Sequence, residues 1–187
     1  MKNYTKKLLC FTLIIAMFLT CSGFNYIEPS YTGIPAPLEG VTVRFVVPES
    51  SGFKSFMDYR KITNKRSFQY RLQSMEEMET STEGIRMIKG RYCLAIGTQF
   101  NAHIGQLFDV VLENGTVIGC CVGDIKADQD TDANNVFSKN GCCSEFIVQT
   151  EYLPKNVSES GDFSNLCEEW DSPVYAIDVY DLFIDEI

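Results

Sequence analysis

The sequence has few of the residues and motifs that mark metal, nucleophilic or nucleotide chemistry. Among 187 residues there is one histidine, His103, and one tryptophan, Trp170. We find no C-x-x-C pair, no Ser/His/Asp set, no phosphate-binding loop and no dinucleotide-binding glycine pattern. These absences argue against a zinc site, a serine-based triad and a nucleotide site. We expect no cofactor and no bound metal.

Basic residues are also scarce. The chain has 16 Lys and Arg against 25 Asp and Glu, which gives a net charge of −9. Lys2, Lys6 and Lys7 lie in residues 1–26, where there is no acid, so residues 27–187 hold 13 basic and 25 acidic side chains. A surface this acidic repels phosphate backbones. Nucleic acid is therefore not an expected partner.

The N-terminus has the pattern of an export segment. Lys6 and Lys7 precede an uncharged run of 13 residues from Leu8 to Thr20, and small residues follow. That run is shorter than the ~20 residues of a membrane-spanning helix, but no charge appears before Glu28. Residues 1–26 are thus a cleaved signal peptide or an uncleaved signal anchor forming a hydrophobic helix. Either one places the rest of the chain outside the membrane.

Residues 27–40 are rich in proline and glycine and form a linker, which leaves residues 41–187 as one domain. Six cysteines fall in this domain, and four of them form two adjacent pairs: Cys93, Cys120, Cys121, Cys142, Cys143 and Cys167. We interpret them as small buried side chains with one or two disulfides. Neighbours within a strand point to opposite faces, so one thiol of each pair should face inward.

Short apolar and β-branched runs with turn signals between them predict a mostly β domain, a small barrel. Strands are expected at 41–47, 92–96, 107–113, 116–122, 145–150 and 174–180. Asn114-Gly115 between two of these runs predicts a hairpin in which both turn residues take a positive φ.

Residues 52–90 are harder to interpret. Residues 53–60 suit a short helix or a strand, residues 69–73 alternate as a strand does, and residues 84–88 form a further strand. Residues 75–83 are polar and are expected to form a loop.

One segment stands out chemically: Gly123-Asp124-Ile125-Lys126-Ala127-Asp128-Gln129-Asp130-Thr131-Asp132. A carboxyl group at a strand end beside apolar walls has a raised pKa and can act as a general acid. We therefore take Asp124, Asp128 and Asp132 as candidate catalytic residues for glycosidic bond cleavage, and Lys126 and Glu145 as candidate binding residues.

Two other interpretations of the segment stay open. Asp-rich turns are common solvated loops. Asp128, Asp130 and Asp132 also match the opening of a calcium-binding loop, although Ala133 and Lys139 then depart from that pattern. The lone His103 lies in an inter-strand loop, where a surface role is the simplest interpretation.

Several stretches resemble small exported proteins of Firmicutes bacteria: residues 53–73, 90–97, 114–115, 123–128 and 145–148. The C-terminal half is similar to the double-psi β-barrel of 3D-domain and RlpA-like proteins. The resemblance implies a six-stranded double-psi-like barrel with short helical elaborations, located in the cell envelope and acting on peptidoglycan or another polysaccharide. It matches Asp124 to the family's barrel aspartate, and Asp128 and Asp132 less closely. Asp130 stands where the family has a histidine before Thr131-Asp132.

The resemblance leaves two functions open: cleavage of glycan strands by Asp-based acid catalysis, and non-catalytic binding of peptidoglycan or a protein partner. The uncleaved anchor would add contact with the membrane.

Overall fold

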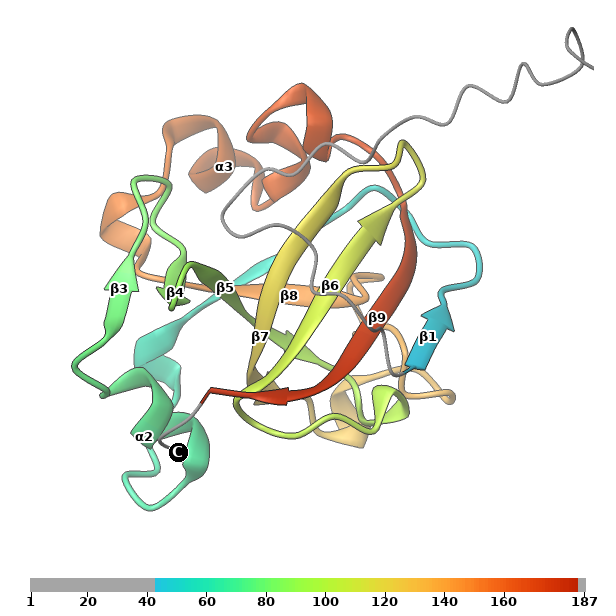
Figure 1. The fold of residues 1–187 in the computed structure, drawn as a ribbon. Helices are drawn as coiled ribbons and strands as arrows, with labels where there is room; N and C mark the ends of the chain where they lie inside the picture. The colour runs from blue at the N-terminus through green and yellow to red at the C-terminus, as the bar shows by residue number, and fades with distance from the viewer. Residues whose placement is uncertain (1–42, 185–187) are drawn as a thin grey trace, which may run out of the picture.

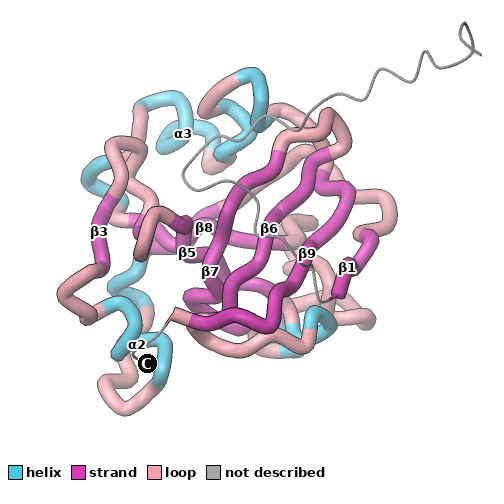
Figure 2. The backbone as a smooth tube through the Cα atoms, viewed as in Figure 1, coloured by secondary structure: helices cyan, strands magenta, loops and turns pink. Residues whose placement is uncertain are grey.

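A computed structural model describes residues 43–184, and this part of the chain is built mainly from β-strands (Figures 1 and 2). The mostly β class predicted from the sequence is confirmed. The described residues contain nine strands in one mixed sheet that does not close into a ring, where six strands were expected. Of the three further strands, β4 matches the strand expected at 84–88, whereas β2 and β3 have three residues each and are too short to produce a clear hydrophobic pattern. The export segment and the linker lie outside the described residues.

The strand order is β1-β9-β6-β7-β5-β4-β3, with β8 paired to β5 and β2 paired to β8. The strands are β1 (Val43–Val46), β2 (Phe56–Asp58), β3 (Met78–Thr80), β4 (Arg86–Ile88), β5 (Arg91–Ile96), β6 (Gln106–Leu112), β7 (Val117–Ile125), β8 (Ser144–Val148) and β9 (Val174–Phe183). The pairs β5–β7 and β2–β8 are parallel and the other pairs are antiparallel. Figure 1 shows β8 crossing behind the layer of β6, β7 and β9, so the sheet is strongly coiled.

The predicted hairpin is confirmed as β6 and β7, but its turn differs from the expected one. Only Gly115 takes a positive φ, at 88°. Its N–H donates to the Leu112 carbonyl at 3.0 Å, and the Thr116 N–H donates to the Asn114 side chain at 3.0 Å. The loop is therefore a three-residue connection with glycine in the left-handed position, and Asn114 caps it with its side chain.

The strand predicted at residues 69–73 is wrong, because these residues belong to helix α2 (Phe68–Gln73). The Ser67 hydroxyl accepts a hydrogen bond from the Tyr70 N–H at 3.1 Å and starts the helix as its N-cap. Leu72 packs into the protein with no exposed surface. In a segment this short, the burial of Leu72 and the Ser67 cap favour the helix more than the alternating sequence pattern favours a strand.

The rest of residues 52–90 resolves as follows. Residues 56–58 form β2 and residues 59–61 a 3-10 turn, while the expected strand at 84–88 is confirmed as β4. β3 lies within the stretch expected to be a loop.

The main core lies on one face of the coiled sheet and is covered by the segment between β8 and β9. That segment contains helix α3 (Lys155–Ser160) and several 3-10 turns. The rings of Phe146 and Trp170 stack at 5.1 Å, and Phe163 lies 4.6 Å from Phe146. Trp170 thus has the packing role that is usual for a buried aromatic. No helix among residues 43–184 is long and apolar enough to cross a membrane.

A second, smaller apolar cluster lies on the opposite face of the sheet, under α2. Adjacent Cys120 and Cys121 show the division, because Cys120 joins the main core and Cys121 packs with Leu72 and Ile147 in the second cluster. The expectation that neighbouring cysteines on a strand face opposite sides is confirmed for this pair. All six cysteines among the described residues are free thiols.

Candidate functional site

A β-bulge at Gly123 determines which face of the sheet carries Asp124. Ile118, Cys120 and Val122 alternate into the main core, so an uninterrupted strand would bury residue 124 there as well. The register to β5 shifts after Val122, which opposes Leu94, whereas Asp124 opposes Ala95. Gly123 is the extra residue, and the shift turns Asp124 to the α2 face.

Gly123 also sits where a side chain has no space. An added Cβ would lie 2.5 Å from the Ile147 Cδ1 and 3.1 Å from the Cys93 Cβ. Any other residue at the bulge would therefore force the end of the Ile147 side chain to move, and would crowd Cys93. This is the local reason for glycine directly before the candidate acid.

The strand register brings Asp124 and Glu145 to the two sides of one small residue. Ala95 on β5 opposes Asp124 on β7 and Glu145 on β8. Neighbouring strands lie about 4.8 Å apart, so the two Cα atoms are separated by about 9.6 Å. Because Ala95 carries only a methyl group, the space between the two acidic residues is left open to longer side chains.

Lys126 reaches Glu145 on this face. Its Nζ lies 2.5 Å from the Glu145 Oε2, and the two side chains are 9% and 17% exposed. The other oxygen of Glu145 accepts hydrogen bonds from the Ser55 hydroxyl at 2.9 Å and the Asn140 amide at 3.3 Å. Glu145 is therefore held as an acceptor by three separate groups.

Asp124 has a different environment. Burial raises its pKa, and nearby Glu145 acts in the same direction. Hydrogen bonds from the Gln69 amide at 3.1 Å and the Ile125 N–H at 2.9 Å, together with the charge of Lys126, act in the opposite direction without cancelling the effect. The result is a carboxyl group that keeps its proton to a higher pH than an ordinary aspartate.

A cleft of about 560 Å³ opens over these residues. Its lining comprises Met57, Ala95, Asp124, Ile125, Lys126, Ala127, Asp130, Ser138, Lys139, Asn140 and Glu145. Three residues singled out from the sequence, Asp124, Lys126 and Glu145, thus come together in one cleft. The walls supply one acid with a raised pKa, an ion pair and several hydrogen-bonding groups, which suits a polar ligand such as a sugar.

The other two predicted catalytic residues are not among the cleft's lining. Asp128 accepts a hydrogen bond from the Thr98 hydroxyl at 2.6 Å at the end of β5. Asp132 accepts the N–H groups of Val136 and Phe137 at 2.8 and 2.9 Å, and these bonds lower its pKa. Both carboxyl groups therefore shape the loop that follows β7.

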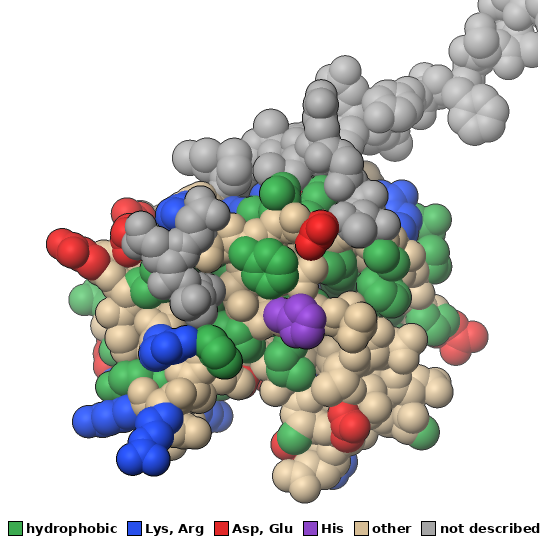
Figure 3. Space-filling model, turned by 60° about the horizontal axis from the view of Figure 1, so that its bottom comes forward, with side chains coloured by type: hydrophobic (Ala, Val, Ile, Leu, Met, Phe, Trp, Pro, Cys, Tyr) green, Lys and Arg blue, Asp and Glu red, His purple; other side chains and the backbone are tan. Residues whose placement is uncertain are grey.

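The described residues give the calcium interpretation no support: no three His, Cys, Asp or Glu side chains among them converge as metal ligands would. His103 lies exposed in the loop before β6, and it lines a separate apolar hollow with Phe68 and Phe183. Figure 3 shows hydrophobic side chains around the histidine on this face.

Three residues of the site came from stretches to which the sequence pattern assigned no chemistry. Ser55 holds Glu145, Gln69 holds Asp124, and Met57 lines the cleft between them. They lie 50 residues or more from their partners, and pairing of β2 with β8 and docking of α2 bring them in. No local signal in the sequence could have identified them.

No protein-family model matches the chain, and no curated protein or solved structure is significantly similar to it.

Proposed function

We propose that this protein is exported to the bacterial cell envelope and cleaves peptidoglycan or another polysaccharide, with Asp124 as the general acid. The observation that carries the proposal is the Asp124 carboxyl group, which has a pKa raised by burial and lies in an open, polar cleft. General acids work best when their pKa approaches the working pH. Protonated Asp124 would donate its proton to the glycosidic oxygen as the bond breaks.

Lys126 and Glu145 have binding roles in this proposal. Glu145 is already held by Lys126, Ser55 and Asn140, so it presents an ordered polar wall. The attacking group would be water or a hydroxyl of the substrate itself, and the carboxylate left on Asp124 after it has protonated the leaving oxygen would take up the proton that the attacking group loses. Attack by a hydroxyl of the substrate corresponds to a lytic-transglycosylase-like reaction, and attack by water to a glycosidase-like reaction.

A double-psi-like strand arrangement belongs to the same proposal. Two parallel pairings in an otherwise antiparallel sheet, and the crossing of β8 behind β6 and β9 (Figure 1), support it, in a sheet that does not close into a ring. Export rests on the sequence pattern of residues 1–26.

A second candidate is a non-catalytic polysaccharide- or protein-binding module. It is favoured by the same three contacts of Glu145, since a carboxylate so engaged is not free to act as a base. The cleft would then recognise a glycan without breaking it.

One experiment separates the two candidates. Purified protein is incubated with cell-wall sacculi, and both its sedimentation and the release of soluble muropeptides are measured. Catalysis predicts release by the wild type and by Asp171→Asn, an exposed carboxylate in the turn before β9, but none by Asp124→Asn. Sedimentation without release would favour the binding module. Failure to sediment and failure to release would remove both.

A further inference from the structure

Positive charge is concentrated in one short segment beside the cleft. Residues 59–75 contain five basic side chains and no acid: Arg60, Lys61, Lys65, Arg66 and Arg71. The rest of residues 27–187 holds eight basic and 25 acidic side chains. Figure 3 shows basic side chains gathered at one edge of its face. So strong a segregation creates a local positive potential on an acidic protein.

Four of these cations have no acidic partner within residues 43–184, and one of the four, Arg71, lies over the Phe68 ring at 4.5 Å. Lys61, Lys65 and Arg66 are exposed, and no carboxylate of the described chain lies within ion-pairing distance. Arg60 differs, because it binds Asp58 and Glu151 at 2.7 and 2.5 Å. The three free charges therefore serve no visible structural purpose.

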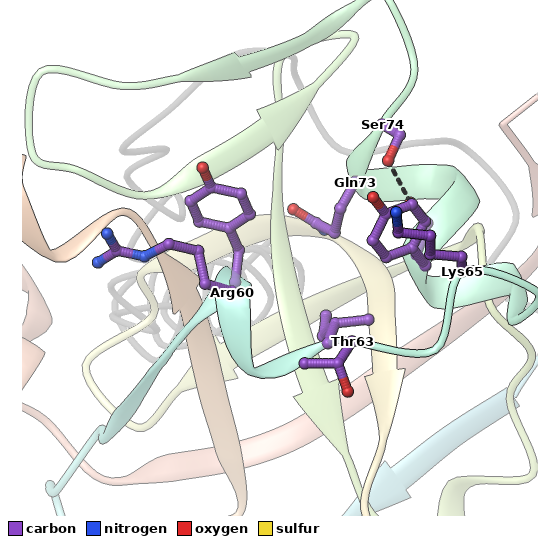
Figure 4. A pocket seen from close by; sticks show the side chains of 8 residues that line it. Arg60, Thr63, Lys65, Gln73 and Ser74 are labelled. Carbon is purple, nitrogen blue, oxygen red and sulfur yellow. Dashed lines mark hydrogen bonds between the residues drawn. The ribbon is translucent and has the colours of Figure 1, made fainter.

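A hollow of about 400 Å³ lies among these residues (Figure 4). Tyr59 and Tyr70 supply aromatic surface, and Lys65 and Gln73 supply polar groups. Figure 4 shows the Gln73 side chain directed into the hollow. Gln73 is 7% exposed, its Oε1 accepts from the Arg86 Nε at 3.2 Å, and its Nε2 has no partner among the described residues.

The hollow continues to the candidate acid. It shares Ile62 and Thr63 with a second hollow of about 290 Å³, which is lined by Lys61, Asn64, Ser67, Gln69 and Asp124. That second hollow shares Asp124 and Met57 with the cleft. The three hollows form one groove with Asp124 near its middle, cations and tyrosines at one end and Glu145 at the other.

We infer that this groove binds a polysaccharide bearing carboxylate groups, with a sugar against Tyr59 and Tyr70 and its carboxylate at Lys61, Lys65 and Arg66. The inference rests on the proposed function, because it names the substrate class of the same groove. Aromatic surface with nearby amide and hydroxyl groups suits sugar rings, and exposed ammonium and guanidinium groups attract carboxylates.

A densely charged chain fits less well. Nucleic acid carries a phosphate at every residue, and the groove beyond the basic end presents Asp124, Asp130 and Glu145, with Lys126 already paired to Glu145 and Lys139 as the other cation in the lining. A polymer with widely spaced carboxylates can place one at the basic end and neutral sugars along the acidic end.

The test is a binding measurement by calorimetry at low and at physiological salt. The probes are a hyaluronan hexasaccharide, with a carboxylate on every second sugar, neutral chitohexaose and single-stranded DNA. The variant is Lys65→Glu/Arg66→Glu. The control, with the same change in net charge, is Lys89→Glu/Lys155→Glu, whose residues line neither the cleft nor the two hollows.

We expect the hyaluronan fragment to bind more tightly than chitohexaose. Added salt should reduce this difference in affinity, because salt screens the attraction between the carboxylates and the exposed cations. Lys65→Glu/Arg66→Glu should weaken hyaluronan binding by roughly tenfold, as the loss of two exposed ion pairs would, and leave chitohexaose binding unchanged. The control variant should bind like the wild type.

Equal weakening in both variants, tighter binding of DNA, or no binding of hyaluronan by the wild type would overturn the inference. None of these binding measurements requires the protein to cleave the oligosaccharide. A protein that binds hyaluronan through Lys65 and Arg66 but cleaves nothing would sustain the inference and refute the catalytic proposal.

Discussion

Removing the cation from the Lys126–Glu145 pair should destabilise the fold to an extent that the structure allows us to estimate. Lys126→Met keeps an apolar side chain of similar length, but Glu145 loses its counter-charge while only 17% exposed. Breaking a buried ion pair costs about 3–5 kcal/mol. Glu145 keeps its bonds to Ser55 and Asn140 and is partly exposed, so we expect a cost at or just below the low end of that range, about 2–3 kcal/mol.

The assay is urea unfolding at pH 7, arranged as a double-mutant cycle. Lys126→Met/Glu145→Gln leaves no unpaired charge, and should recover about 1–2 kcal/mol of the loss as coupling energy. Lys155→Met is the control, since its pair with Glu159 is 3.7 Å long and exposed, and should cost no more than about 0.5 kcal/mol. If Lys126→Met cost as little as Lys155→Met, or if the coupling were near zero, the described role of the pair would be refuted.

Three further predictions concern the residues around the acid. Burial raises the pKa of Asp124, so its protonated carboxyl group favours the folded state at low pH, and this contribution to stability is lost as the pH rises through the pKa of the folded protein. Asp124→Asn should therefore unfold at a higher temperature than the wild type at pH 7, and the difference in unfolding temperature should disappear near pH 4. A difference that grows as the pH is lowered would refute this sign. Cys93 and Cys121 are register partners on neighbouring parallel strands, both side chains are fully buried, and the Cys93 thiol together with burial raises the pKa of Cys121; neither thiol should react with an alkylating reagent in the folded protein at pH 7, both should react in urea, and rapid labelling of either cysteine in the native protein, read by mass spectrometry, would contradict this burial. Gly123→Ala forces Ile147 to move and should cost about 1–3 kcal/mol in urea unfolding, so a variant as stable as the wild type would contradict the close approach at the bulge.

Much of the β-structure could be predicted because it is encoded locally. Long apolar runs gave β5, β6, β7, β8 and β9, and Asn114-Gly115 marked the hairpin. β2 and β3, with three residues each, carry too little pattern to be recognised, and α2 depends on a serine cap and on the docking of Leu72. Where long-range contact decides the conformation, a single sequence does not contain the deciding information.

Some residues of the candidate site could likewise be identified from the sequence, and others could not. Asp124, Lys126 and Glu145 could be singled out because each lies at the end of a recognisable strand, and the register of β5 then brings them to one cleft. Asp128 and Asp132 looked equivalent to Asp124 in the sequence, but they bond to Thr98 and to backbone N–H groups of their own loop. The difference arises at Gly123, where one extra residue in the strand redirects a side chain in a way that alternation cannot reveal.

The central claim is that protonated Asp124 breaks glycosidic bonds. The most direct measurement is the rate at which new reducing or anhydro ends appear in purified peptidoglycan, recorded against pH for the wild type and for Asp124→Asn. The account predicts a wild-type rate that falls as pH rises through the pKa of Asp124, and loss of the reaction in Asp124→Asn. Equal rates in the two proteins at every pH would contradict it.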